Sequence, residues 1–233
     1  MKNFRSTTGP FLERPFYEDR EIETICTEAL REVGLLPTRP EAVRIDRFIE
    51  KRFGVVPTYE DLPDGVLGLT RFGQKGVREV VVAKALDDDS STVAERRIRT
   101  TLAHEGGHCL LHAHLFALAT PTQKLFGDFS EPDKPKVLCR DEVLGNSRVQ
   151  YAGNWWEFQA NRAIGGLLMP SALVTESLGE FMLKGPAGFP HFDHDRIEEA
   201  ARALAEVFNV NPLVAKIRIK QLFGADTQQQ WLL

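Results

Sequence analysis

The pentapeptide His104-Glu105-Gly106-Gly107-His108 combines two imidazoles and a carboxylate at a spacing that suits zinc chemistry. Positions i and i+4 of a helix lie on one face about one turn apart, so His104 and His108 can bind the same Zn²⁺ ion while Glu105 acts as a general base. Only three positions of the pattern are fixed, so the alternative is a helix whose histidines are ordinary surface or core residues. Four of the six histidines lie within residues 104 to 114, and this clustering favours metal binding.

A third protein ligand is needed, because two histidines and a water molecule leave one tetrahedral position open. His112 continues the histidine stripe but lies one turn beyond the ion. His114 has the spacing of the third histidine of metzincins, yet Leu111 stands where that class has a glycine that turns the chain. Glu157 lies on a later predicted helix, with Asn161 one turn further to hydrogen-bond the free ring nitrogen of a histidine ligand. Taken alone, however, Glu157 would be a solvated helix carboxylate.

The motif must be positioned by a long helix, which the pattern predicts from about residue 92 to about residue 114. Residues 87 to 91 are polar and offer an N-cap. We expect this helix to be central and partly buried, so that it carries the motif into the interior. Its apolar positions are Val93, Ile98, Leu102 and Leu110.

Two β-rich runs precede that helix, at residues 66 to 72 and 77 to 83, and a glycine-flanked loop joins them into a predicted hairpin. The second strand is either a core strand or an exposed edge that a peptide could extend. Residues 116 to 154 contain scattered proline and glycine and predict a long connector with short elements. The remaining apolar periods predict helices at residues 18 to 34, 40 to 53, 155 to 169, 171 to 183, 193 to 208 and 211 to 223.

The composition bounds the class of protein. The chain has 233 residues, of which 42% are hydrophobic and 27% charged, as in a globular protein of one domain or two closely packed lobes. A net charge of −4 argues against a broad phosphate-binding surface, so direct nucleic-acid binding is not expected. The start has no apolar signal region and no run approaches a membrane span, which predicts a cytoplasmic protein without a membrane partner.

The cysteines are too few and too scattered for a disulfide framework. Inert buried thiols are the favoured interpretation of Cys26, Cys109 and Cys139. Two alternatives are a redox pair of Cys109 with Cys139, and an inhibitory thiolate of Cys139 in the open zinc position.

Two longer segments carry a family resemblance. Residues 101 to 112 read TLAHEGGHCLLH, followed by Glu157-Phe158-Gln159-Ala160-Asn161 and Leu167-Leu168-Met169-Pro170. Together they resemble the ImmA/IrrE family of zinc metallopeptidases. The resemblance implies the zinc ligands His104, His108 and Glu157, with Glu105 as catalytic base, in a thermolysin-like gluzincin site. Departures from the family are Gly106 in place of an apolar residue, Ile164-Gly165-Gly166, and a long connector between the two segments.

The expected fold is α+β, a mainly helical zincin-like metallopeptidase with a small antiparallel sheet or hairpin packed on the motif helix. We divide the chain into an N-terminal arm and helix (1 to 35), the metallopeptidase core (36 to 175) and a C-terminal helical region packed on it (176 to 233).

The adjacent glycines Gly106 and Gly107 cost a helix about 1 kcal/mol each relative to alanine. Such a cost is reasonable where a substrate or a neighbouring strand approaches the helix closely.

The function expected is zinc-dependent endoproteolysis of a specific intracellular protein. The resemblance implies a helix-turn-helix transcriptional repressor as substrate, in a stress response or in mobile-element regulation. The alternative is a non-proteolytic regulator that binds a repressor or DNA and keeps zinc as a structural centre. A donor to the oxyanion is also required, and the candidates, each more often a surface or structural residue, are His191, His194, Tyr151 and Arg140.

Overall fold

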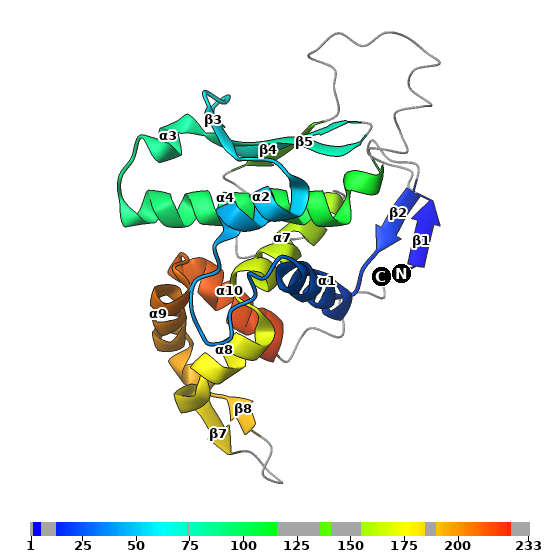
Figure 1. Ribbon diagram of the computed structural model, residues 1–233. Coiled ribbons are helices and arrows are strands. Elements are labelled where there is room, and N and C mark those ends of the chain that lie inside the picture. The colour runs from blue at the N-terminus through cyan, green and yellow to red at the C-terminus, as the bar shows by residue number, and fades with distance from the viewer. Residues whose placement is uncertain are drawn as a thin grey trace.

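The computed structural model describes residues 2–5, 13–73, 75–115, 136–140, 155–184 and 190–224. Within these ranges the fold is α+β (Figure 1). The strands are β1 (Lys2–Arg5), β2 (Glu13–Phe16), β3 (Thr58–Glu60), β4 (Val66–Gly73), β5 (Gly76–Ala83), β6 (Lys136–Arg140), β7 (Met182–Lys184) and β8 (Pro190–Phe192). The helices are α1 (Asp19–Glu32), α2 (Ile45–Phe53), α3 (Lys84–Asp87), α4 (Thr92–Leu111), α7 (Trp155–Leu168), α8 (Ser171–Ser177), α9 (Ile197–Phe208) and α10 (Pro212–Phe223), with 3₁₀ turns η2 (Gly179–Phe181) and η4 (His194–Arg196).

The largest sheet has the order β3-β5-β4-β6. Its centre is the predicted hairpin of β4 and β5, which is confirmed as antiparallel, with Gly76 at φ +108° where the chain reverses. The expectation of a purely antiparallel sheet is wrong, because β3 pairs with β5 in parallel. β5 therefore lies between β3 and β4, and Val80, Val81 and Val82 are fully buried. Residues 81 to 83 are therefore a core strand with partners on both sides, whereas the pairing with β3 does not reach residues 77 to 80, for which the edge reading stays open.

Helix α4 lies between this sheet and helix α7 (Figure 1). Ser91 caps its first turn, because the Ser91 hydroxyl accepts a hydrogen bond from the Ala94 amide at 3.1 Å. The predicted start of the helix is confirmed, whereas its end falls at Leu111 rather than at residue 114. Val93 is 58% exposed, so its predicted inward position is wrong. From Thr100 onward the helix is covered by the sheet on one side and by α7 on the other, which explains why the motif is buried.

Several helices begin or end at other residues than predicted. The helix expected from residue 40 begins only at Ile45, because Val43 is buried in a segment without regular secondary structure and its carbonyl accepts a hydrogen bond from Arg99 at 2.9 Å. The helix expected over residues 171 to 183 ends at Ser177 and is followed by η2 and β7. The pair of β1 and β2 was not predicted. The helices α1, α7 and α10 match their predictions to within about two residues at each end.

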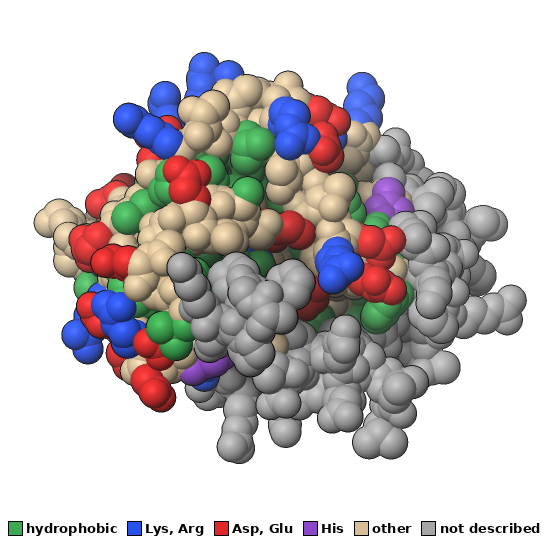
Figure 2. Space-filling view, turned by 90° about the horizontal axis from the view of Figure 1, so that it is seen from below, with side chains coloured by type: hydrophobic (Ala, Val, Ile, Leu, Met, Phe, Trp, Pro, Cys, Tyr) green, Lys and Arg blue, Asp and Glu red, His purple; other side chains and the backbone are tan. Residues whose placement is uncertain are grey.

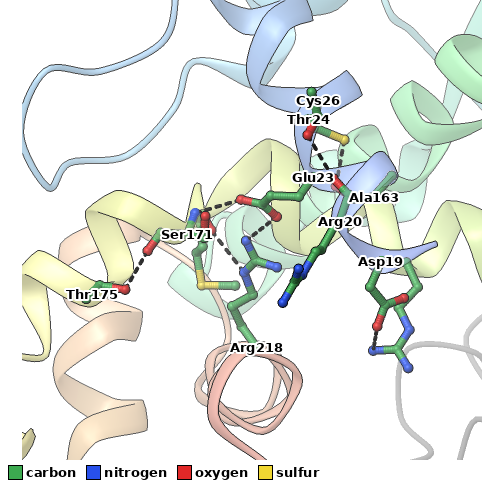
Figure 3. Close-up of polar contacts among 11 residues, drawn as sticks. Asp19, Arg20, Glu23, Thr24, Cys26, Ala163, Ser171, Thr175 and Arg218 are labelled. Atoms are coloured by element: carbon green, nitrogen blue, oxygen red, sulfur yellow. Dashed lines mark hydrogen bonds and ion pairs between the residues drawn. The ribbon is translucent and has the colours of Figure 1, made fainter. Parts of the chain in front are cut away.

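One hydrophobic cluster joins the N-terminal, central and C-terminal parts of the described chain, and Leu30, Phe48, Leu167 and Phe208 are among its fully buried members. A partly buried ion pair adds to this junction (Figure 3). The Arg218 guanidinium on α10 donates to Glu23 of α1 at 2.6 Å and to the Met169 carbonyl at 3.0 Å, while Glu23 also accepts from the Ser171 amide. The elements that flank α7 are thus tied together by polar contacts as well as by apolar packing.

The surface carries charges of both signs. Figure 2 shows basic and acidic side chains interspersed over the described part of one face. In the described part of the chain, no helix has the length and apolar character that a membrane span requires.

Candidate metal centre

Helix α4 brings three residues of the motif into the interior. His104, Glu105 and His108 are all fully buried. The two imidazoles lie one turn apart and nearly edge-on, with ring centroids 4.7 Å apart and Nε2 atoms 3.0 Å apart. The helical spacing expected from the sequence therefore holds, and it presents two ring nitrogens to one point in space.

Helix α7 supplies the carboxylate. Glu157 Oε2 lies 3.2 Å from His104 Nε2, and Glu157 Oε1 lies 3.5 Å from His108 Nε2. In a tetrahedral zinc site with bonds of about 2.0 to 2.2 Å, neighbouring ligand atoms are about 3.3 to 3.5 Å apart. Each separation lies within a few tenths of an ångström of that range, and the two histidines face different oxygens of Glu157. Within the described residues these are the side chains whose ligand atoms converge in such a group. The donor set fits a divalent ion of the zinc type.

Asn161 lies one turn after Glu157 on the same helix. Its Oδ1 is 2.9 Å from His104 Nδ1 and accepts a hydrogen bond from it. A neutral imidazole that donates through Nδ1 has its lone pair on Nε2, the atom that faces Glu157. The structure thus brings Asn161 to the position that the sequence suggested, against the back of a candidate ligand.

His112 and His114, the other candidates for third ligand, point elsewhere. His112 is buried, and its Nδ1 contacts His108 Nδ1 at 3.0 Å, on the side of that ring away from Glu157. His114 is exposed. Neither belongs to the group of converging ligand atoms, which consists of His104, His108 and Glu157.

The two histidines and Glu157 shift one another's pKa values. Burial lowers the pKa of His104, but the hydrogen bond and negative charge of Glu157 outweigh it and raise this pKa overall. For His108 burial dominates, and the pKa is lowered. Burial alone would raise the pKa of Glu157, yet contact with both histidines holds it far below its usual range. A carboxylate held ionised between two buried imidazoles favours a cation at the centre.

Glu105 points toward strand β4. Its Oε2 accepts a 2.6 Å hydrogen bond from the Thr70 hydroxyl, and both residues are fully buried. Burial raises the pKa of Glu105 to about 7, although His104 and the Thr70 hydrogen bond pull it downward. Among the described residues nothing hydrogen-bonds to Glu105 Oε1. One oxygen is therefore held by the Thr70 hydroxyl, while the other is buried without a hydrogen-bond partner among the described residues, in a carboxyl whose pKa lies near neutral.

Glycines allow the close packing around the centre. A Cβ atom on Gly107 would lie 2.9 Å from Ala163 Cβ and 3.1 Å from Ala160 Cα, so α4 and α7 could not keep their distance. Likewise, a Cβ on Gly68 of β4 would lie 2.5 Å from the Thr101 side chain. The expectation for the motif glycines needs correction, because the element that approaches Gly107 is helix α7. The strand approaches α4 through its own glycine.

Replacing Gly107 with alanine is expected to lower the free energy of unfolding by about 1 to 2 kcal/mol. Overpacking of a rigid contact costs about 1 to 3 kcal/mol, and the better helix propensity of alanine offsets up to about 1 kcal/mol. Zinc affinity should fall as well, because Glu157 moves with α7. Gly106→Ala is the matched control, since its nearest neighbour is the flexible end of Leu167 at 3.3 Å. Urea denaturation and zinc titration of both variants check this, and equal behaviour of the two would contradict it.

The suggested oxyanion donors are not assembled at the centre by the described residues. His194 is exposed and stacks edge-on against Phe192 at 5.4 Å. Its neighbours in the chain, β8 and α9, lie away from the sheet that covers α4 (Figure 1). His191 and Arg140 are placed only as backbone, in β8 and β6, and Tyr151 lies outside the described residues. The side chain of Cys139 is likewise not described, whereas Cys109 is a buried thiol whose pKa is raised by burial.

Two residues of the centre were not predicted from the sequence: Thr70, which holds Glu105, and Gln159, which contacts His112 at 3.0 Å.

Comparison of the sequence with models of protein families and with curated proteins gave no match. The function therefore has to be argued from the geometry of the centre.

Proposed function

We propose that this protein is a zinc-dependent endopeptidase with a zincin-like fold of the ImmA/IrrE type. The observation that supports this most directly is the pairing of a three-ligand group, His104, His108 and Glu157, with a separate buried carboxylate on the same helix. A purely structural zinc site is usually closed by four protein ligands and has no use for Glu105. Three ligands leave a coordination position open for reacting groups.

Zinc in such a site polarises a scissile carbonyl and lowers the pKa of water that it binds. In this proposal the chain's own residues transfer the proton and hold the reacting groups in position. Glu105 takes a proton from the attacking water through Oε1 and later passes it to the leaving amine. Thr70 holds Oε2, so that the carboxylate keeps one orientation during both transfers. Asn161 holds the ring of His104 from behind.

The substrate that we propose is an intracellular protein, with a helix-turn-helix repressor as first candidate. The test is to determine the zinc content of the purified protein and incubate it with a panel of helix-turn-helix regulators from the same genome, following fragments by mass spectrometry. We expect about one zinc per chain and defined fragments that disappear when a chelator removes the metal. Fragments that persist unchanged in chelator would overturn the proposal. Zinc binding and repressor release without fragments would instead support a docking regulator with a structural zinc.

Removing the Thr70 hydroxyl is expected to move the acid side of the pH profile. The pKa of Glu105 is about 7, and the Thr70 hydrogen bond lowers it, so Thr70→Val raises it further. Because the base works in its ionised form, the acid limb of kcat/KM should move to higher pH. A hydrogen bond to a charged group is worth about 1.5 to 3 kcal/mol, which corresponds to about one to two pH units.

The control is Thr70→Ser, which keeps the hydroxyl and should keep the profile. A pH series of kcat/KM between about pH 5 and 9 checks the shift. A uniform loss of rate at every pH would mean that Thr70 supports the packing of β4 on α4 and has no influence on the ionisation of Glu105.

A further inference from the structure

A chain of buried hydrogen bonds leads from the candidate ligand His108 to the N-terminal strand β2. His108 Nδ1 contacts His112 Nδ1 at 3.0 Å, His112 Nε2 contacts Gln159 Oε1 at 3.0 Å, and Gln159 Nε2 contacts the Pro15 carbonyl at 2.8 Å. His108 and His112 are fully buried and Gln159 is 5% exposed. We name these contacts, from the Pro15 carbonyl to His108, the relay.

The direction of each hydrogen bond follows from its fixed end. A backbone carbonyl can only accept, so the Gln159 atom that contacts Pro15 must be the amide NH₂, and Oε1 must face His112. Because Oε1 can only accept, His112 carries its proton on Nε2. His112 is buried with its ring edge-on to Trp155 at 5.6 Å, an environment that favours the neutral ring. Its Nδ1 is then an acceptor.

The hydrogen bond between His112 and His108 determines the tautomer of the candidate ligand His108. Since His112 Nδ1 accepts, His108 Nδ1 must be the donor between them. A neutral His108 with its proton on Nδ1 has its lone pair on Nε2, the atom 3.5 Å from Glu157 and 3.0 Å from His104 Nε2. The other tautomer would direct an N–H at the centre and could not bind a metal there.

We infer that His112 and Gln159 are positioning residues that hold His108 in the one tautomer able to bind the metal, with the Pro15 carbonyl of β2 as the fixed end of the relay. Asn161 has the corresponding role for His104 from α7 alone. His108 differs from His104, because the orientation of the His108 ring depends on strand β2, about 90 residues earlier in the chain. The docking of residues 13–16 thereby becomes part of the metal site. The inference rests on the proposed zinc site but does not need the peptidase activity.

Ring tautomers test the relay directly in the zinc-loaded wild-type protein. Long-range ¹H–¹⁵N NMR of ¹⁵N-histidine-labelled protein distinguishes a proton on Nδ1 from one on Nε2. We expect His104 and His108 to be protonated on Nδ1 and His112 on Nε2. A proton on His112 Nδ1 in zinc-bound protein would overturn the relay and leave the zinc site intact. Failure of the wild-type protein to bind zinc would count against the proposed function itself and against the relay with it.

Variants provide a second measurement that does not depend on the spectrum. His112→Phe keeps a ring against Trp155 but offers no acceptor, and His112→Asn returns an acceptor near the position of Nδ1. We expect zinc affinity to fall about 10- to 100-fold in His112→Phe and to recover largely in His112→Asn. Gln159→Met should lower affinity less, because His112 itself remains.

His114→Phe is the matched control for a histidine of the same segment, and it should bind zinc as the wild type does. Competition titration with a chromophoric chelator measures all four variants, and circular dichroism checks that each is folded. Equal zinc affinity of folded His112→Phe and wild type would overturn the relay. A loss that His112→Asn does not recover would assign His112 a packing role and would also overturn it.

Discussion

Glu105→Gln is expected to lower the rate of peptide hydrolysis by about 10²- to 10⁴-fold, the usual contribution of a positioned general base. The glutamine has nearly the same shape, and its Oε1 can still accept the hydrogen bond from Thr70, which is 2.6 Å long in the wild type. It cannot take up a proton near neutral pH. The loss should therefore appear in kcat, because substrate binding does not require that proton transfer.

Zinc binding should survive this substitution. Glu105 lies outside the group formed by His104, His108 and Glu157, so the variant keeps all three ligands. The zinc content and zinc affinity of Glu105→Gln should equal those of the wild type within about threefold, well below the effect of losing a residue that orients a ligand. This separates loss of the base from loss of the metal. A variant that lost both would show that Glu105 helps to hold the site together.

The measurement compares cleavage of one repressor by wild type, Glu105→Gln and Glu176→Gln. Glu176 is exposed on α8, so its substitution controls for the change of charge and should leave the rate unchanged. Equal rates for the wild type and Glu105→Gln would remove Glu105 from the mechanism. The preparation must then be checked for a contaminating protease, using chelator sensitivity and the loss of activity in a ligand variant.

Local patterns in the sequence were enough to predict the elements that carry the centre. The His104 and His108 spacing, the Ser91 cap and the β-rich runs joined by a glycine-flanked loop each act within a few residues, and the structure reproduces them. The gathering of Glu157 with the two histidines depends on how α7 crosses α4, which sequence spacing does not contain. The signal for it in the sequence is the resemblance of two distant segments to one family of metallopeptidases.

The missed features all depend on contacts between distant segments. Thr70 meets Glu105 across 35 residues and Gln159 meets Pro15 across 144, and neither residue type is unusual in a strand or a helix. The parallel pairing of β3 was missed because three residues leave too short a pattern. Gly68 and Gly107 were the available signals, since a glycine inside a strand or helix often marks close approach of another backbone. Which backbone approaches cannot be read from the glycine alone.

Glu157→Ala is expected to weaken zinc binding more than about 100-fold, beyond the range for residues that only orient ligands. With the carboxylate gone, His104 and His108 remain, and two imidazoles one turn apart cannot enclose the ion. The separations of 3.2 and 3.5 Å from Glu157 to the two rings make it the member that joins α7 to α4 through the metal. Loss of zinc should therefore also loosen the packing of these two helices.

The weaker zinc binding of Glu157→Ala can be measured as a smaller zinc-dependent rise in Tm. Zinc at about 1,000 times its Kd stabilises the wild type by about 4.1 kcal/mol, which raises Tm by about 8 to 16 °C for a chain of this size. At the same zinc concentration, a Kd raised 100-fold in Glu157→Ala lowers the stabilisation by zinc to about 1.4 kcal/mol. Comparing the zinc-dependent shift within each variant cancels any effect of the substitution on the metal-free protein. That cancellation is needed because metal-free Glu157 already pairs with both histidines.

Two controls decide which residue completes the site. Glu176→Ala removes an exposed carboxylate and should keep the full zinc-dependent shift. His114→Ala removes the histidine at the metzincin spacing and should keep it too, because His114 is exposed and outside the converging group. A full shift in Glu157→Ala together with a lost shift in His114→Ala would transfer the third ligand to that histidine. The end of α4 would then have to rearrange on binding zinc, since His114 follows Leu111, where the helix stops.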